Sequence, residues 1–299
     1  MKRTLIATHS GEFHADDAFA VATLELALSL GKEEIEIIRT RDEDIIHSAD
    51  WVLDVGGIYD PETKRFDHHQ LGSPVRKNGI PYAAFGLMWK HVGVDVTGNA
   101  EVAKFVDEQL VQDIDAADNG SHSYTPNPEH KTLRPTTIDN LVQAFRAPWG
   151  ENINPDTCFP HAVAFAKGIL ERTIAQAHGD MRAKEIINEV IESYSDTIPV
   201  FETLIPSRLF PSNTPFGVAI MPYDKTTGSW KAQAMRIHPR EFKTRVLFPK
   251  EWAGLRDEEF KKVSNVSDAK FCHLSRTMAF ALSKEGALAL AKQAKSNED

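Results

Sequence analysis

The sequence predicts an α/β protein: a parallel-sheet N-terminal domain with helical segments, followed by a smaller α/β domain. Near the N-terminus, short apolar stretches alternate with helical patterns, as is typical of parallel α/β sheets. Near the C-terminus, shorter strand-like stretches replace the long helical patterns. Between them, the proline-rich residues 198–215 indicate a crossing from one domain to the next. We therefore expect two domains, residues 1–195 and 196–299.

The first elements follow in the order strand, helix, strand, short helix, strand. Residues 4–8 form an apolar strand-like stretch, 18–30 carry Ala, Leu and Val at helical spacing before Gly31, and strand-like stretches return at 35–40 and 51–55. Ligands of such sheets bind at the carboxyl ends of the strands. His9 and Asp54 lie near two of these ends, so we expect the chemistry there.

Further helices and strands are predicted along the rest of the chain. Helical spacing recurs over 82–92, 100–117, 137–145 and 160–194, the last with an expected break at His178–Gly179–Asp180. The polar residues 121–131 predict a loop or lid. In the second domain we expect strands at 216–221, 230–237 and 270–274 and helices at 257–262 and 284–295.

Composition narrows the class of protein. No apolar run is long enough to cross a membrane, and the apolar start at residues 4–7 is too short for a signal peptide. Cys158 and Cys272 are far apart, so neither a disulfide framework nor a zinc finger is expected. We therefore predict a cytoplasmic protein, with a homo-oligomer left open. The net charge of −9 argues against a surface coated with nucleic-acid-binding charge, but allows a locally basic cleft.

The triplet Asp67-His68-His69 is the most informative stretch. An acid and two imidazoles side by side suit a cation, which neutralises the acid and accepts a lone pair from a neutral imidazole. A polar loop is the alternative. Asp54 adds a carboxylate inside an apolar strand, where burial is costly unless the acid is paired or metal-bound, although a turn or capping Asp would also fit.

Two further acids lie at the end of the predicted helix 100–117. Asp115 and Asp118 are three positions apart and so share a helix face. Carboxylates at a helix C-terminus oppose the helix dipole, and a bound cation would relieve that conflict. The alternative is a solvated acidic helix end capped by Asn119 and Gly120.

Together these residues predict a metal site without thiolates. Its candidate ligands are His9, His14, Asp16, Asp54, His68, and Asp115 or Asp118. The large share of carboxylates favours Mn²⁺ or Mg²⁺ over Zn²⁺ or Fe²⁺. The set exceeds what one tetrahedral ion needs, so we expect two cations bridged by Asp54. Such a pair can activate a water and stabilise a leaving oxygen in phosphoryl hydrolysis.

These motifs resemble those of the DHH phosphoesterase superfamily, and more closely those of the MYG exonuclease family. The stretches that carry the resemblance are Thr8–Ala18, Val52–Pro61, Phe66–Gln70 and Asp115–Gly120, with further similarity at Trp230, Phe248–Pro249, Trp252–Asp257 and Glu285–Leu288. The resemblance covers nearly the whole chain.

The resemblance implies roles for individual residues. His9 would be the leading histidine, His14 and Asp16 would replace the usual Asp-x-Asp pair, and Asp54 and His68 would be ligands. Asp115 or Asp118 would supply the last ligand, and we favour Asp115. His69 would contact substrate phosphate or support the metal ligands from behind, and Asp67 would orient an imidazole, so Asp54, Asp67 and His69 form the catalytic set. In a substrate-binding cap domain, Arg245 and His273 would contact phosphates.

The function implied is a divalent-metal-dependent phosphodiesterase, a 3′–5′ RNA exonuclease with two cations, Mn²⁺ by preference, that activate water for in-line attack on phosphate. Short oligonucleotides, cyclic dinucleotides or pyrophosphate are alternative substrates. A catalytically silent metal- or nucleotide-binding regulator and a mononuclear zinc hydrolase are alternatives from other classes. One departure concerns the cap: Ser275–Ala281 stands where relatives have a Gly-rich run, which puts substrate fit there in question.

Overall fold

A computed structural model describes residues 3–29, 34–121, 125, 128–129, 132–238 and 241–296. Most of the loop or lid predicted at 121–131 lies outside the described residues. The chain divides into two compact units, residues 1–178 and 179–299. Within the described residues, no helix combines the length and the apolar character needed to span a bilayer.

The first unit is built on a five-stranded sheet in the order β2-β1-β3-β5-β4. Its strands are β1 (Arg3–Thr8), β2 (Glu34–Arg39), β3 (Trp51–Leu53), β4 (Tyr59–Asp60) and β5 (Arg65–Phe66). The first three and β5 are parallel, and β4 joins the edge in antiparallel pairing with β5. The parallel α/β class predicted from sequence is confirmed.

The strand predicted for residues 51–55 ends early, at Leu53. Asp54 adopts a left-handed conformation with φ of 57°, which takes the chain out of the extended ladder. Aspartate tolerates this conformation better than most residues, because its short polar side chain bonds locally. Gly56 and Gly57 continue the reversal with φ of 91° and 68°. The turn leaves the Asp54 carboxylate at the carboxyl end of the sheet.

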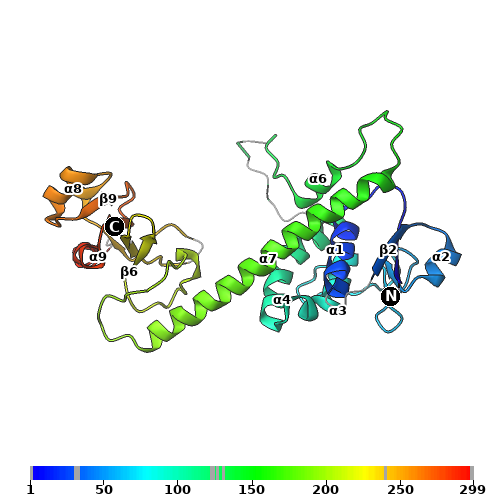
Figure 1. The fold of residues 1–299 in the computed structure, drawn as a ribbon, viewed down its shortest axis with the longest axis horizontal. Coiled ribbons are helices and arrows are strands. Elements are labelled where there is room, and N and C mark those ends of the chain that lie inside the picture. Colours follow the sequence, from blue (N-terminus) through cyan, green and yellow to red (C-terminus); the bar gives the residue numbers. More distant parts are fainter. Residues whose placement is uncertain are drawn as a thin grey trace. The chain divides into compact units, whose positions relative to one another are not determined.

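Helices surround this sheet (Figure 1). They are α1 (Ala15–Ser29), α2 (Glu43–Ser48), α3 (Ala84–Thr97), α4 (Ala100–Val106), α5 (Gln112–Asp118) and α6 (Ile138–Gln143). Helix α1 is buried from Ala15 to Leu24 and packs against α3. The single helix predicted over 100–117 is interrupted, since a π-helical segment, η1 (Asp107–Val111), separates α4 from α5.

Helix α7 (Pro155–Glu192) runs without interruption, so the break predicted at His178–Gly179–Asp180 is wrong. Polar partners stabilise this stretch: His178 Nε2 lies 3.0 Å from the Thr97 carbonyl, and Asp180 accepts two hydrogen bonds from Arg208. The two units divide inside α7, at 178/179, whereas we expected the boundary at 195/196. The last turns of α7 pack on an apolar cluster that includes Phe201, which explains their place in the second unit.

The second unit contains a four-stranded antiparallel sheet in the order β6-β7-β10-β9. Its elements are β6 (Val218–Asp224), β7 (Ser229–Ala234), β9 (Ala269–Cys272), β10 (Met278–Ala281), the pair β8 (Val246–Leu247) and β11 (Lys295–Ser296), α8 (Asp257–Ser264) and α9 (Lys284–Ala291), with 3₁₀ turns η2 (Ser207–Leu209) and η3 (Lys250–Trp252). The smaller α/β unit predicted from sequence is present. Strand β10 was missed, and it lies in the stretch that departs from the family pattern.

A lysine is buried in the middle of this sheet. Lys231 on β7 is 7% exposed, and its Nζ donates to Gln233 Oε1 at 3.2 Å. Burial lowers its pKa from 10.5 to about 8. The folded state therefore binds fewer protons than the unfolded state between these values, so this group makes stability rise with pH across that window.

We expect Lys231→Met to stabilise the protein at pH 7 by about 1–3 kcal/mol, because it removes the cost of burying the charge. The gain over wild type should shrink between pH 8 and 10.5. Thermal unfolding at several pH values measures this, with the exposed Lys225→Met as control. Equal effects of the two substitutions, at every pH, would contradict the assignment.

Candidate metal centre

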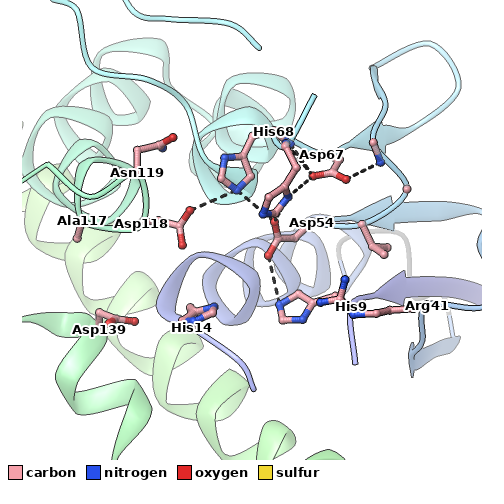
Figure 2. Close-up of a pocket in the computed structure, with 14 residues that line it drawn as sticks. His9, His14, Arg41, Asp54, Asp67, His68, Ala117, Asp118, Asn119 and Asp139 are labelled. Carbon is pink, nitrogen blue, oxygen red and sulfur yellow. Dashed lines mark hydrogen bonds and ion pairs between the residues drawn. The ribbon is translucent and has the colours of Figure 1, made fainter. Parts of the chain in front are cut away.

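A cavity of about 900 Å³ opens in the first unit at the carboxyl ends of its parallel strands (Figure 2). Its lining includes four histidines and four aspartates: His9, His14, His68, His69, Asp54, Asp67, Asp118 and Asp139. Arg41, Asn119, Ala117 and the turn Val55–Gly57 complete the wall. The candidate residues predicted from four separate stretches of the first unit therefore lie, with one exception, in or beside a single cavity.

Asp54 lies at the centre of this group. It is 4% exposed, and its two carboxylate oxygens face different histidines. Oδ2 is 3.4 Å from His9 Nε2, while Oδ1 is 3.3 Å from His68 Nε2. Figure 2 shows the carboxylate between the two imidazoles. One carboxylate thus faces two sets of ligand atoms, as a bridging ligand must.

His68 connects Asp54 to a second acid. Its Nε2 lies 3.2 Å from Asp118 Oδ2 and 3.9 Å from Asp16 Oδ2. His14, Asp16 and Asp118 also bring one ligand atom each within 4.8 Å of one another. The N-terminus of α1 is held in place by Asp139, which accepts a hydrogen bond from the Ala15 amide at 3.1 Å.

Asp17 is a site residue that the sequence did not reveal. It is fully buried, and its Oδ1 accepts hydrogen bonds from the amides of His14 and Ala18. Its Oδ2 lies 3.1 Å from His9 Nε2. Because His9 Nδ1 donates to the Ser10 carbonyl at 3.2 Å, Nε2 is the nitrogen that faces Asp17 and Asp54, and it would bind a cation after losing its proton. The signal was the Asp-Asp pair at the start of α1, of which only Asp16 was predicted.

Asp67 accepts hydrogen bonds from the other two residues of the triplet and does not join the cluster around Asp54. Its Oδ1 accepts from the amides of His68 and His69 and from His69 Nδ1 at 2.7 Å. Its Oδ2 accepts from Gly57 N–H at 2.6 Å. With Nδ1 as the donor, His69 presents Nε2 outward on a side chain that is 64% exposed. Asp67 therefore fixes the orientation of an imidazole.

The buried acids and imidazoles of the cluster shift one another's pKa values. Burial, together with the carboxylates of Asp54 and Asp118, raises the pKa of Asp16 well above its ordinary range. Burial would also raise the pKa of Asp54, but its close contacts with the imidazoles of His68 and His9 reverse the sign and lower it. For His9, burial is outweighed by Asp17 and Asp54, which raise its pKa to about 10.

The residues present fit divalent cations. Five buried atoms of the cluster form no regular hydrogen bond with any described residue: both oxygens of Asp16, Oδ2 of Asp17, Oδ1 of Asp54 and Nε2 of His68. Four of the five lie only within ion-pair distance of an oppositely charged group, and Asp16 Oδ1 has no such contact within the described part of the chain. Buried polar atoms without partners are rare in folded proteins. Carboxylate oxygens and imidazole nitrogens are ligands for Mn²⁺ and Mg²⁺, and a cation would satisfy these atoms together.

Asp115 is the exception among the predicted residues of this unit. Its carboxylate is fully buried but accepts hydrogen bonds from Arg76 Nη1 at 2.6 Å and from Gly86 N–H at 2.9 Å. None of the candidate metal groups found among the described residues includes it. Our preference for Asp115 over Asp118 as the last ligand therefore conflicts with the geometry. Asp118 is the acid beside His68. The Asp115 carboxylate is already paired with the guanidinium of Arg76.

Arg245 and His273, predicted to contact phosphates, lie in the second unit. Arg245 Nη2 donates to the Ser212 carbonyl, and its Nε is buried without a hydrogen bond to any described residue. His273 is exposed and its Nδ1 lies 2.6 Å from Ser275 Oγ. Ser275 belongs to the stretch that departs from the family pattern, so this departure bears directly on His273.

We expect Gly86→Ala to lower the free energy of unfolding by about 1–3 kcal/mol, since an added Cβ would overlap the Asp115 carboxylate and crowd Arg76. Chemical denaturation measures the loss. Gly168→Ala in α7 is the matched control, because a Cβ there meets no atom within 4 Å and Ala favours helix. Equal stability changes at the two glycines would contradict this account.

The position at the sheet ends and the His/Asp chemistry define the first unit as a metal-binding α/β domain. A family model named for the MYG1 exonucleases, described as an uncharacterised protein family (UPF0160), matches residues 5–294. The chain therefore belongs to the MYG1 exonuclease family, whose name denotes hydrolases.

Two relatives illustrate the similarity. The MYG1 protein of Dictyostelium discoideum is 28% identical over 320 residues, covering 97% of this chain and 96% of the relative. The MYG1 exonuclease of Homo sapiens is 29% identical over 323 residues, covering 96% of this chain and 84% of the relative.

Among solved structures, the chain is similar to RecJ from Thermus thermophilus in complex with Mn²⁺, with a TM-score of 0.27 and 12% identity, covering 98% of this chain and 52% of that one. It is also similar to an exonuclease RecJ bound to manganese, with a TM-score of 0.27 and 13% identity, covering 96% and 88%. The chain spans about half the length of the Thermus RecJ.

Proposed function

We propose that the protein is a divalent-metal-dependent phosphodiesterase that shortens RNA from its 3′ end. Membership in the MYG1 exonuclease family supports a nuclease. The observation that carries the proposal is the convergence of buried carboxylate and imidazole atoms on Asp54, several of them without hydrogen bonds to any described residue. The Asp67-His68-His69 triplet supports a place in the wider DHH phosphoesterase superfamily.

We infer two cation positions that share Asp54. Asp54 belongs to two of the three candidate ligand groups, one that includes His9 and Asp17 and one that includes His68. His14, Asp16 and Asp118 form the third. Mn²⁺ is our preferred ion, and Mg²⁺ shares the same ligand chemistry. Bound cations would lower the pKa of water and stabilise charge on the leaving oxygen.

Side chains of the protein itself orient the groups of the site. Asp67 accepts a hydrogen bond from His69 Nδ1 and so directs Nε2 away from its own carboxylate, where Nε2, when it carries a proton, can donate to a phosphate oxygen. Asp54, held between two imidazoles, stays ionised and keeps its oxygens on the two sides of the site. We assign His69 to the substrate phosphate and Asp67 to its orientation, and Arg245 and His273 of the second unit to further phosphates.

The direct test is digestion of a short RNA, labelled at its 5′ end, by the purified chain with Mn²⁺. We expect a ladder of labelled products shortened from the 3′ end. Asp54→Asn and Asp118→Asn should each reduce the rate by about 100-fold or more, because loss of even an outer partner of a metal ligand costs 10–100-fold. Asp113→Asn, exposed on the same helix as Asp118, is the matched control and should stay active.

No shortening with Mn²⁺, Mg²⁺ or any other divalent ion, or full activity in Asp54→Asn, would contradict the proposal. Turnover of short oligonucleotides, cyclic dinucleotides and pyrophosphate in the same assay ranks the alternative substrates. Metal binding without turnover of any of them would favour a silent regulator. A cytoplasmic location and a homo-oligomeric state stay predictions.

A further inference from the structure

Arg76 reaches from the loop after the triplet into the helical layer. Its side chain is 5% exposed, with Nη1 donating to Asp115 Oδ2 at 2.6 Å and Nη2 to Asp107 Oδ1 at 2.9 Å. The guanidinium also lies 3.9 Å from the centre of the Tyr82 ring. A planar guanidinium can hold two carboxylates in fixed directions, which an ammonium cannot do.

The two acids held by Arg76 lie at the start of an irregular turn and in the helix that follows it. Asp107 begins the π-helical segment η1, and Asp115 lies in α5 beyond it. A π-helical turn contains an extra residue, so it rotates the following side chains about the helix axis. The direction of the α5 side chains therefore depends on how this turn is held, and Arg76 joins its first residue, Asp107, to Asp115 in α5.

Hydrogen bonds of Asp115 connect Arg76 to the end of α5. Its Oδ1 accepts from Gly86 N–H, which fixes it against α3. Its backbone carbonyl accepts from the Asn119 amide at 3.1 Å and from Asn119 Nδ2 at 2.8 Å. Asp118 lies between these two residues, three positions after Asp115, and meets His68 at 3.2 Å. The same loop that carries Arg76 follows His68 and His69 in sequence.

We propose that Arg76 is a positioning residue of the metal centre, acting through Asp115 to aim Asp118 at His68. Arg76 joins the two segments that must meet there, the loop after the triplet and helix α5. This inference rests on the proposed function in one respect, namely that the cluster binds a divalent cation. In this inference Asp115 holds the end of α5 in place, and it is not the metal ligand that the sequence suggested.

The test is a double-mutant cycle between Arg76 and Asp118, read as Mn²⁺ affinity by calorimetry without RNA. Arg76→Met should weaken Mn²⁺ binding by about 10-fold or more, the loss typical of a residue that orients a ligand. In an Asp118→Asn background, the same substitution should change the affinity little, because the ligand on which Arg76 acts is already lost. Equal losses in both backgrounds, or no loss in either, would overturn the inference.

Further variants separate positioning from folding. Arg76→Met with Asp115→Asn removes both buried charges, while the introduced amide still accepts from Gly86 N–H; stability should recover but affinity should stay low. Should Arg76→Met alone not fold, this pair and Asp107→Asn carry the cycle. Recovery of affinity together with stability would overturn a positioning role.

Arg208→Met is the matched control, since Arg208 forms a two-contact pair with Asp180 in the second unit. It should leave Mn²⁺ affinity unchanged. If the wild-type protein binds no divalent cation, the proposed function fails and the inference falls with it. If the wild type binds Mn²⁺ and the Arg76 variants bind it equally well, only the inference fails.

Discussion

The mutual repulsion of buried carboxylates around Asp54 is the constraint on which the first unit depends. Asp16, Asp17 and Asp54 are each at most 4% exposed, and Asp118 adds a fourth carboxylate beside them. Burying several like charges together is unfavourable unless opposite charge enters the site. Two imidazoles supply part of that charge in the protein itself. Divalent cations would supply the rest.

The fold brings these acids together by simple means. Parallel strands place their carboxyl ends at one edge, so that the segment after β1 and the turn after β3 meet there. The left-handed turn at Asp54 ends β3 one residue before the acid, and the start of α1 adds Asp16 and Asp17. The positive end of the helix dipole favours acids at that position. Backbone geometry thus accounts for much of the site.

The sequence was informative wherever chemistry and local pattern coincided. Strands β1 and β2 match their predicted ranges within one residue, and His9, Asp54 and His68 were identified because each is polar at the end of an apolar stretch or in the triplet. Asp115 and Asp118 could not be separated, since both lie on one helix face. Their difference comes from Arg76, which is 39 positions before Asp115 in sequence, and from a π-helical turn that periodicity does not reveal.

Longer-range contacts also explain the other differences. Gly179 suggested a helix break, but partners of His178 and Asp180 elsewhere in the chain keep α7 continuous. Asp17 was missed because its neighbour Asp16 already fitted the motif.

The central claim is that the cluster holds two divalent cations bridged by Asp54, and anomalous diffraction from a crystal soaked in Mn²⁺ tests it most directly. The account predicts two peaks about 3.5–4 Å apart, both in contact with Asp54. A single peak, or no peak in contact with Asp54, would contradict it.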